Sequence, residues 1–419
     1  MFSTIVRKLN TEEIQRYVEI VINAYPGFSQ NTEDYKERFT KRLVDIQENE
    51  PSLEFYGLFR DGNLLGGMRI HYYTMNLFSK MVEVGGVGLV AVDLLHKKEK
   101  VAKEMIEGFI EHFQKKGTSL VMLYPFRPDF YKKMGFGYGP KMNHYEIDPL
   151  SFPNGKDKSG LLYLNAKHKN LIKDCYDSYA RSTHGMFVKN DNELEAMFKN
   201  PDNKFVGVFE NEKLQGYINF SFEKGGERNF LDNHIVVKEL IYHNPLALTK
   251  ICTFLHNQAD QIKRIIFNTV DPTLEFLLDD ARNGSGNLIP PVYHETNTSG
   301  VGLMYRVINL SQLVEDLQGK HFGEDCSFKL RTTDTLLSEE NEVLMKVQNG
   351  KLTMVEKDVL DFDFEVELDI SDFSSLVMGA VDAYTLYNYG KLRINNEYHL
   401  KTLFTVFHSP QKPICMTGY

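Results

Sequence analysis

Helical spacing of apolar residues marks the first fifty positions of the chain. Ile14, Val18 and Val21 lie three or four residues apart, which places them on one face of a predicted helix over 11–24. A second helix is expected over 31–47. The chain therefore opens with two predicted helices.

After residue 50 the pattern changes from helical spacing to that of strands. Three stretches of this kind follow one another at 54–59, 63–78 and 81–92. Asp61 and Gly62 separate the first two stretches and form a turn-favouring pair, and a short polar pair separates the last two. These residues predict an antiparallel meander of three strands.

A helix with one apolar face comes next, and it is expected to pack on the sheet. Its apolar residues are Val101, Met105, Ile106, Phe109, Ile110 and Phe113. Gly117 ends this helix, and 119–125 is a short strand that is apolar on both faces, as in a parallel pair. A short helix at 127–134 and further strand at 135–149 complete this part of the chain.

An internal repeat links residues 54–70 to residues 204–220. The sequences EFYGLFRDGNLLGGMRI and KFVGVFENEKLQGYINF align without a gap at an offset of 150. A strand, a helix over 248–261 and another strand follow the second copy in the order seen after the first, which indicates duplication. The copies differ where HKKEK is matched by HNPLAL and Tyr131 by Glu275. We therefore infer that the second copy keeps the scaffold and has lost the site.

The last quarter of the chain has a different pattern of elements. An amphipathic helix is predicted over 307–317, and a hairpin with an Asn-Gly turn over 343–356. Residues 361–370 alternate between apolar and acidic side chains, as in a strand with one buried face. A short helix opened by Ser371 or Asp372 follows. These elements predict a separate α+β domain.

The composition is that of a globular protein. The chain has 419 residues, 42% hydrophobic and 25% charged, and this length favours two or three domains. No apolar run approaches the ~20 residues needed to span a bilayer, and we expect no secretion signal. The four cysteines form no CxxC pair, which favours a reduced, cytoplasmic protein, and the thirteen histidines show no metal-ligand spacing.

One basic cluster stands out in a chain whose net charge is −9. The acidic balance argues against nucleic-acid binding and suits a cationic substrate such as an amine. Lys97, Lys98 and Lys100 lie at the start of the helix whose dipole favours acids there. The cluster is either a tolerated surface charge or receives an anion. A strand end, a tight loop and a helix N-terminus form an anion site, and lysines beside them would hold a pyrophosphate.

The strand, basic loop and helix, followed by PDFYKKMGFGYGP, resemble the acetyl-CoA site of GNAT-type N-acetyltransferases. The whole chain resembles the Eis group of this family on the motifs VGLVAV, FYKKMGFGYG and DISDFSSLVMGAVDAYTLYNYGKL. The resemblance implies two tandem GNAT folds, each a mixed sheet with flanking helices, and a sterol-carrier-like α+β domain. The boundaries would be 1–150 for a catalytic GNAT domain, 151–303 for a degenerate GNAT domain and 304–419 for the third domain.

The same resemblance implies a set of acetyl-CoA contacts. They are the strand residues Val90, Ala91 and Val92, the loop residues Lys97, Lys98, Glu99 and Lys100, the helix residues Val101, Ala102 and Lys103, and finally Phe126 and Arg127. The strand backbone would pair with the pantetheine arm, and the loop and helix would hold the phosphates. The family usually has glycine in place of Lys100, and glycine lets a backbone approach phosphate without a Cβ.

The resemblance also assigns an acid and a base for acetyl transfer. Tyr131 takes the position of the family's general acid, and a tyrosine hydroxyl with a pKa of ~10 can protonate a departing thiolate. In Eis-like proteins the base is the chain's own terminal carboxylate, which here belongs to Tyr419. An α-carboxyl pKa of ~3.3–3.7 is low for a base, and desolvation in the site would raise it.

These features predict an acetyl-CoA-dependent N-acetyltransferase that acts without a metal on a cationic amine, such as an aminoglycoside or a polyamine. By resemblance, the protein would form a homo-oligomer such as a hexamer. Two alternatives stay open: another acyltransferase on a doubled GNAT scaffold, and a non-catalytic lipid- or amine-binding protein whose cofactor loop has decayed. The third domain argues against the first alternative, because aminoacyl- and long-chain acyl-transfer enzymes of this kind lack one.

Overall fold

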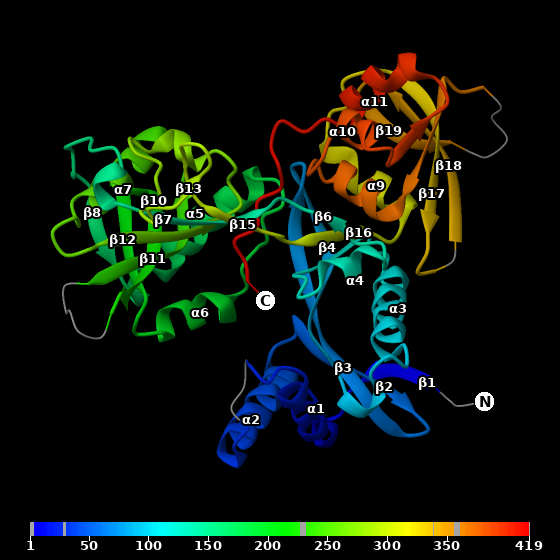
Figure 1. Ribbon diagram of the computed structural model, residues 1–419, viewed down its shortest axis with the longest axis horizontal. Coiled ribbons are helices and arrows are strands. Elements are labelled where there is room, and N and C mark those ends of the chain that lie inside the picture. The colour runs from blue at the N-terminus through cyan, green and yellow to red at the C-terminus, as the bar shows by residue number, and fades with distance from the viewer. Residues whose placement is uncertain (1–3, 28–30, 227–231, 338, 356–360, 419) are drawn as a thin grey trace. The chain divides into compact units, whose positions relative to one another are not determined.

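The computed structural model describes residues 4–27, 31–226, 232–337, 339–355 and 361–418. The chain divides into two compact units (Figure 1), and each is described by itself. The first unit joins Met1–Gly139 to Leu303–Pro413, and the second comprises Pro140–Gly302 and Ile414–Gly418. Among the described residues, the helices are all too short or too polar to cross a membrane.

The first unit contains a seven-stranded sheet with the strand order β1-β2-β3-β4-β5-β16-β6. Its strands are β1 (Thr4–Lys8), β2 (Leu53–Arg60), β3 (Asn63–Leu77), β4 (Lys80–Val92), β5 (Leu120–Leu123), β16 (Met304–Val307) and β6 (Gly137–Tyr138). Strands β1 to β4 are antiparallel, and β5 runs parallel to β4. The predicted meander and the predicted parallel strand are confirmed.

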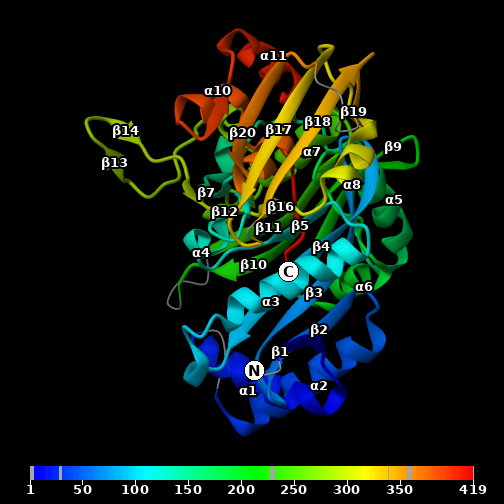
Figure 2. The same cartoon turned by 90° about the vertical axis from the view of Figure 1, so that its right-hand side faces the viewer.

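Helices cover both faces of this sheet. They are α1 (Thr11–Ala24), α2 (Glu33–Asn49), α3 (Val101–Lys115) and the short α4 (Pro128–Lys132). Adjacent residues of a strand point to opposite faces. A Cβ on Gly66 would meet side chains of α3, and a Cβ on Gly67 would meet Tyr17 of α1. Helices α1 and α3 therefore lie on opposite faces of the sheet. Figure 2 shows α3 lying across the strands.

The second unit repeats this architecture with the strand order β8-β9-β10-β11-β12-β7-β15. Its strands are β7 (Met142–Ile147), β8 (Leu161–Leu164), β9 (Lys204–Glu210), β10 (Lys213–Lys224), β11 (Asn233–Tyr242), β12 (Arg264–Thr269) and β15 (Thr298–Gly300). Its helices are α5 (Lys169–Ser182), α6 (Asp191–Lys199) and α7 (Pro245–His256), and a hairpin joins β13 (Leu288–Ile289) to β14 (Tyr293–His294). The predicted repeat of element order is confirmed.

Helix α7 begins earlier and ends earlier than the predicted range 248–261. The side chain of Asn244 accepts a hydrogen bond from the backbone N–H of Ala247, and Pro245 takes the first helical position. A proline at this position lacks an N–H that would have no helical partner anyway. The cap and the proline together set the start of α7.

The two sheets exchange one strand each. In the first sheet the strand between β5 and β6 is β16, which comes from residues after the second copy of the repeat. In the second sheet the strand between β12 and β15 is β7, which directly follows the first copy. The sheets therefore divide the chain differently from the predicted boundaries at 150 and 303.

A third region completes the first unit around a five-stranded sheet with the order β19-β18-β17-β20-β21. Its strands are β17 (Cys326–Asp334), β18 (Glu339–Gln348), β19 (Lys351–Val355), β20 (Phe364–Asp369) and β21 (Leu392–Ile394). Its helices are α8 (Leu310–Asp316), α9 (Ile370–Val377), α10 (Ala383–Asn388) and α11 (Leu400–Phe407). The predicted helix over 307–317 is thus shorter, because its first residue belongs to β16.

The predicted alternation over 361–370 is confirmed from Phe364 onward, where Phe364, Val366 and Leu368 are buried. The expectation that Ser371 or Asp372 opens the next helix is wrong. Asp369, the last residue of β20, caps α9 instead, because its carboxylate accepts a hydrogen bond from the Ser371 backbone N–H at 2.8 Å. The strand therefore passes into the helix without a loop.

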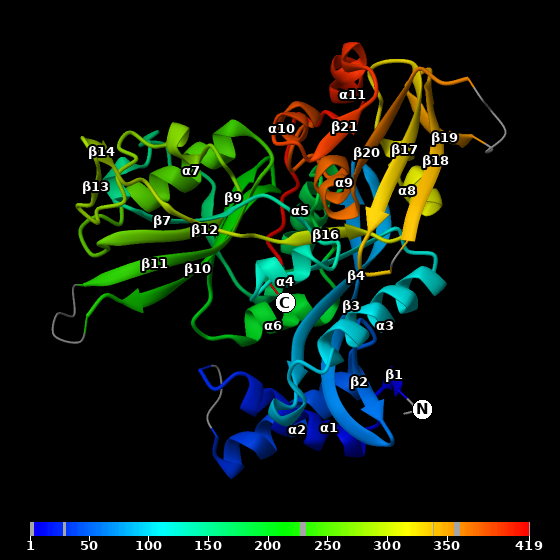
Figure 3. The ribbon, with the colours of Figure 1, turned by 45° about the vertical axis from the view of Figure 1, so that its right-hand side comes forward.

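Helix α9 packs against β16 and β6 and so joins the third region to the first sheet (Figure 3). The backbone N–H of Val307 donates to the Ser374 hydroxyl at 2.9 Å. Beside this contact the fully buried guanidinium of Arg306 donates to the carboxylate of Asp334 at 2.5 Å and to the backbone carbonyl of Met134. Asp334 also accepts hydrogen bonds from the backbone of residues 336 and 337. One buried ion pair thus links β16, the end of β17 and the turn after β17.

Replacing Asp334 with asparagine is expected to destabilise the first unit strongly. The Arg306 guanidinium would stay buried without a counter-charge, which typically costs about 3–5 kcal/mol. Thermal and urea unfolding should both show the loss. The control is Glu342→Gln, whose partner Arg331 is 47% exposed and whose loss should cost less than about 1 kcal/mol. Equal unfolding midpoints for Asp334→Asn and the control would contradict this prediction.

Candidate active site

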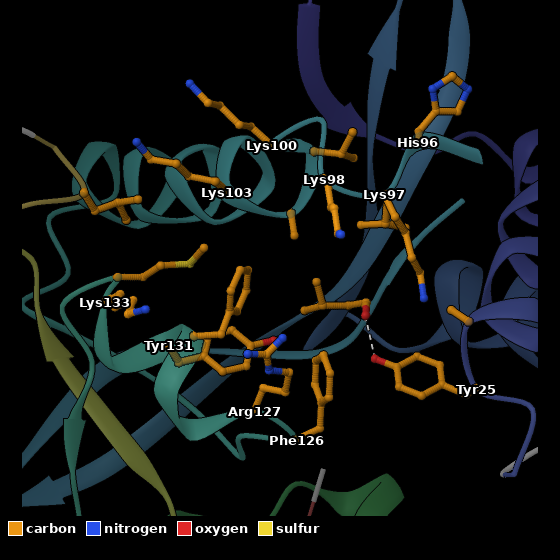
Figure 4. Close-up of a pocket in the computed structure, with 18 of the residues that line it drawn as sticks. Tyr25, His96, Lys97, Lys98, Lys100, Lys103, Phe126, Arg127, Tyr131 and Lys133 are labelled. Atoms are coloured by element: carbon orange, nitrogen blue, oxygen red, sulfur yellow. Dashed lines mark hydrogen bonds between the residues drawn. The ribbon is translucent and has the colours of Figure 1, made fainter. Parts of the chain in front are cut away.

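A cavity of about 890 Å³ lies in the first unit between β4, the N-terminus of α3 and α4 (Figure 4). Ten of the twelve predicted acetyl-CoA contacts line it, together with the predicted acid Tyr131. These ten are Val90, Val92, Lys97, Lys98, Lys100, Val101, Ala102, Lys103, Phe126 and Arg127. The structure therefore brings residues from two strand ends, a loop and two helices around one space.

The remaining two predicted contacts point elsewhere. Ala91 is 1% exposed and packs in the core cluster on the α1 side of the sheet, because it alternates with its neighbours Val90 and Val92. Glu99 accepts from Arg60 at 3.4 Å and lies 3.1 Å from a ring nitrogen of His96. Neither residue lines the cavity.

A β-bulge in β4 shapes the wall of the cavity. Pairing between β3 and β4 shifts register after Gly67, and Leu89 has a left-handed backbone with φ of 50°. Two tyrosine hydroxyls donate to the carbonyls at this bulge: Tyr17 to Leu89 at 2.6 Å and Tyr25 to Val90 at 2.5 Å. Bulges re-aim the chain and end regular pairing, and they are common beside active sites.

Strand β4 separates from its parallel neighbour before it reaches the bulge. The two strands pair only at Gly85 with Val121 and at Gly86 with Met122. Beyond Gly86, therefore, the edge of β4 that would face β5 has no paired strand beside it in the described chain, and this edge borders the cavity. The carbonyls of Leu89 and Val90 already accept from Tyr17 and Tyr25, and the other backbone groups of this edge could pair with an extended ligand.

The loop between β4 and α3 takes two left-handed residues before the helix begins. Lys98 has φ of 70° and Lys100 has φ of 65°. Lys100 is the N-cap residue of α3, and its side chain makes no capping hydrogen bond, whereas the N-cap Asn10 of α1 caps its helix fully. The first N–H groups of α3 are thus without a side-chain cap at an end that lines the cavity.

Positive charge at this helix end is largely without an ion-pair partner in the described part of the chain. Among the described residues, Lys97, Lys98 and Lys100 have no ion-pair partner, while Lys103 lies 3.4 Å from Glu107. The side chains of Lys97 and Lys98 point toward the cavity, and those of Lys100 and Lys103 point away from Tyr131 (Figure 4). Unpaired ammonium groups and free helix N–H groups favour an anionic ligand here.

Tyr131 lies on α4 and is 3% exposed. Burial raises the pKa of its hydroxyl above the ordinary tyrosine value, and the neighbouring Tyr25 adds to the rise. No described residue forms a hydrogen bond with this hydroxyl. Phe126 stands between the two tyrosines, with ring centroids 6.2 Å from each and edge-to-face geometry. Tyr131 is therefore a protonated hydroxyl at the cavity wall that has no internal partner.

Several lining residues were missed by the sequence analysis. They are Ala24, Tyr25, His96, Phe130, Lys133, Met134, Thr335 and Leu336. Thr335 and Leu336 come from the turn after β17, and the Thr335 hydroxyl donates to the Lys133 carbonyl at 3.1 Å. Tyr25 directly follows the predicted helix 11–24, and no local pattern marks it as a cavity residue. No local pattern marks Thr335, which reaches the cavity through tertiary packing.

Arg127 lines the cavity but is already paired, because its guanidinium donates to the carboxylate of Asp129 at 2.6 Å. Tyr419 lies outside the described residues, so its role as the base stays a prediction. The segment before it belongs to the second unit, where the backbone N–H of Ile414 donates to the His184 carbonyl at 2.8 Å. In the described part of the chain, no cluster of three His, Cys, Asp or Glu side chains could hold a metal ion.

The equivalent region of the second unit differs from the first at the N-terminus of its helix and at the residue matched to Tyr131. The N-terminus of α7 carries its own side-chain cap from Asn244. Glu275, the residue matched to Tyr131, accepts a hydrogen bond from the Tyr145 hydroxyl at 3.1 Å. These contacts agree with the inference that the second copy has lost the site, which stays a prediction.

Comparison with known proteins identifies three domains. Residues 5–139 match the acetyltransferase (GNAT) domain, residues 185–307 match a second acetyltransferase (GNAT) domain model, and residues 312–416 match the sterol carrier protein domain. No curated protein matches the chain significantly.

Solved structures share the whole fold at low sequence identity. A GCN5-related N-acetyltransferase from Anabaena variabilis is 18% identical with a TM-score of 0.80, and a conserved protein of unknown function from Enterococcus faecalis is 18% identical with a TM-score of 0.79. Eis1 from Mycobacterium abscessus is 16% identical with a TM-score of 0.75. In each case all of this chain and all of the other chain are covered. The chain is thus an acetyltransferase of the GNAT class, built from two GNAT domains and a C-terminal sterol carrier protein domain.

Proposed function

We propose that the protein transfers an acetyl group from acetyl-CoA to a primary amine of a cationic small molecule. The observation that carries the proposal is the uncapped N-terminus of α3, which opens into the same cavity as Tyr131. The unpaired lysines beside it supply positive charge that an anionic carrier would neutralise. A GNAT domain implies an acyl-CoA, and the choice of acetyl is part of the proposal.

The residues around the cavity fit such a carrier. Lys97 and Lys98 point inward, and the first backbone N–H groups of α3 have no side-chain cap, so a pyrophosphate would meet both. The free edge of β4 at Val90 and Val92 would pair with the pantetheine arm. When bound, acetyl-CoA supplies an activated thioester. A carrier in this position would extend from the lysines along β4 toward the row of aromatic rings.

Tyr131 is proposed as the general acid. An amine attacks the thioester carbonyl, the carbon–sulfur bond breaks, and the departing thiolate takes the proton of the Tyr131 hydroxyl. The raised pKa keeps this hydroxyl protonated at neutral pH. The cationic amine gives one proton to the general base before the attack, and the second proton, which it loses after the attack, restores the Tyr131 hydroxyl. The base then releases its proton to solvent, which leaves the site unchanged after one turnover.

The general base is proposed to be the terminal carboxylate of Tyr419, on the resemblance to the Eis group. A cationic amine such as an aminoglycoside or a polyamine is proposed as the acceptor, because the chain carries a net charge of −9. A protein with a decayed cofactor loop is the second candidate, favoured only by lysine at a position that is usually glycine in the family. A thermal-shift measurement with acetyl-CoA separates the two candidates. Acetyl-CoA should raise the melting temperature of the acetyltransferase and leave that of a protein with a decayed cofactor loop unchanged.

Tyr131→Phe is expected to lower kcat by about 100-fold or more while leaving the Kd for acetyl-CoA unchanged. Release of CoA with kanamycin-like amines and polyamines measures the rate, and calorimetry measures the Kd. Because the pKa of Tyr131 is raised, the loss of rate from its deprotonation should begin above about pH 10 in the wild-type protein. An unchanged kcat in the variant would remove Tyr131 from the mechanism.

We expect the left-handed backbone of Lys100 to lower the stability of the fold, and its charge to matter less for acetyl-CoA binding than the charge of Lys98. Lys100→Gly relieves the strain of the left-handed conformation and should have a free energy of unfolding about 1 kcal/mol higher than Lys100→Ala, which keeps the strain.

Lys98→Ala removes an inward-pointing ammonium and should weaken acetyl-CoA binding about 10-fold, more than Lys100→Gly does. Chemical unfolding and calorimetry check the two parts. Equal stability of the two Lys100 variants would refute the backbone argument.

Extending the chain by one glycine after Tyr419 tests the proposed base. The extension moves the carboxylate by one residue, so turnover should fall sharply while acetyl-CoA still binds. Steady-state rates and calorimetry on the extended protein measure the two effects. A turnover equal to that of the natural chain would exclude the terminal carboxylate as the base.

A further inference from the structure

Tyr25 lines the cavity and is held both at its backbone and at its hydroxyl. Its backbone N–H donates to the Val21 carbonyl at 3.0 Å and ends helix α1. Its hydroxyl donates to the Val90 carbonyl at 2.5 Å (Figure 4). A tyrosine ring fixed at its backbone and at its hydroxyl has little freedom to swing aside.

The surrounding residues hold the ring of Tyr25 further. The ring meets Phe126 edge-to-face, with the centroids 6.2 Å apart and the planes at 80°. Phe126 itself is 62% exposed, whereas Tyr25 is half-buried, and burial raises the pKa of its hydroxyl. Of these two rings, Tyr25 is the one attached to the bulged strand. It therefore forms a fixed wall beside Val90.

We propose that Tyr25 determines which acyl chain length the site accepts. This inference rests on the proposed function, because it takes the cavity as the acyl-CoA site. The sulfur must lie within reach of the Tyr131 hydroxyl, and the carrier reaches it from the lysines along the edge of β4. The acyl carbons then extend past the sulfur. Tyr25 lines the same cavity, and the ring of Phe126 lies 6.2 Å from the rings of both Tyr25 and Tyr131, so Tyr25 lies near the place that the sulfur would take.

The size limit follows from the bond between Tyr25 and Val90. An acetyl group has one carbon beyond its carbonyl, and a butyryl group has three. The longer chain would have to displace the ring of Tyr25, which breaks the hydrogen bond to Val90 and the contact with Phe126. Each methylene that a pocket rejects or accepts typically changes selectivity by about 10-fold or more.

The experiment compares acetyl-CoA with butyryl-CoA in the wild-type protein, Tyr25→Ala and Tyr25→Phe. Calorimetry without an amine gives the ratio of the two affinities, and CoA release with an amine gives the ratio of the two kcat/KM values. Tyr25→Ala should shift both ratios toward butyryl-CoA by about 10-fold or more. Tyr25→Phe keeps the ring and loses only the anchoring hydroxyl, so its shift should be smaller in both ratios.

Tyr35→Ala is the matched control, because it removes a tyrosine of α2 that does not line the cavity. Its ratios should equal those of the wild type. If Tyr25→Ala fails to fold, Tyr25→Leu supplies the same comparison with a smaller, apolar side chain. Unchanged ratios in a Tyr25 variant that binds acetyl-CoA overturn this inference and leave the proposed function intact. A wild-type protein that binds neither acyl-CoA overturns both.

Discussion

The separation of β4 from β5 is the constraint on which the rest of the site depends. A strand that stayed regular would continue to pair with β5, and there would be no space between them. Because β4 turns away after two paired residues, its edge is left without a strand partner and α3 begins at a distance from β5. The backbone carbonyls of Leu89 and Val90 would otherwise lack hydrogen-bond donors at the bulge. The hydroxyls of Tyr17 and Tyr25 donate to them. The cavity and the exposed helix end follow from the separation of β4 from β5, and the bulge at Leu89 shapes the wall beside the aromatic rings.

Much of the fold could be predicted because its signals are local. Apolar spacing gave the helix over 11–24 with its observed bounds, and turn residues separated the strands of the meander. The cavity-lining residues 97–103 were predictable from a strand, a basic loop and a helix in sequence. Tyr25 and Thr335 were not, because tertiary contacts bring them to the cavity. The side chain of Ala91 faces the core on the α1 side, because alternate residues of a strand face opposite sides, and its predicted backbone contact with the carrier stays a prediction.

The sterol carrier protein domain is part of the acetyltransferase site in a structural sense. The pair formed by Arg306 and Asp334 holds the turn after β17, and two residues of that turn line the cavity. Leu336 also belongs to the core cluster beneath α3. Thr335 and Leu336 of the sterol carrier protein domain thus form part of one wall of the cavity. Changes in this domain, far along the chain from the lysines, would therefore alter the wall of the cavity.

The exchanged strands have a consequence for how the chain can form during synthesis. The first sheet has a gap between β5 and β6 until residues 304–307 leave the ribosome, by which time nearly three quarters of the protein has been made. The amino-terminal domain cannot complete itself early, as domains in tandem usually do. Until then its unfilled slot is a ready template for any free strand, including one from a neighbouring nascent copy. Completion of the first sheet therefore depends on residues that follow the second copy of the repeat.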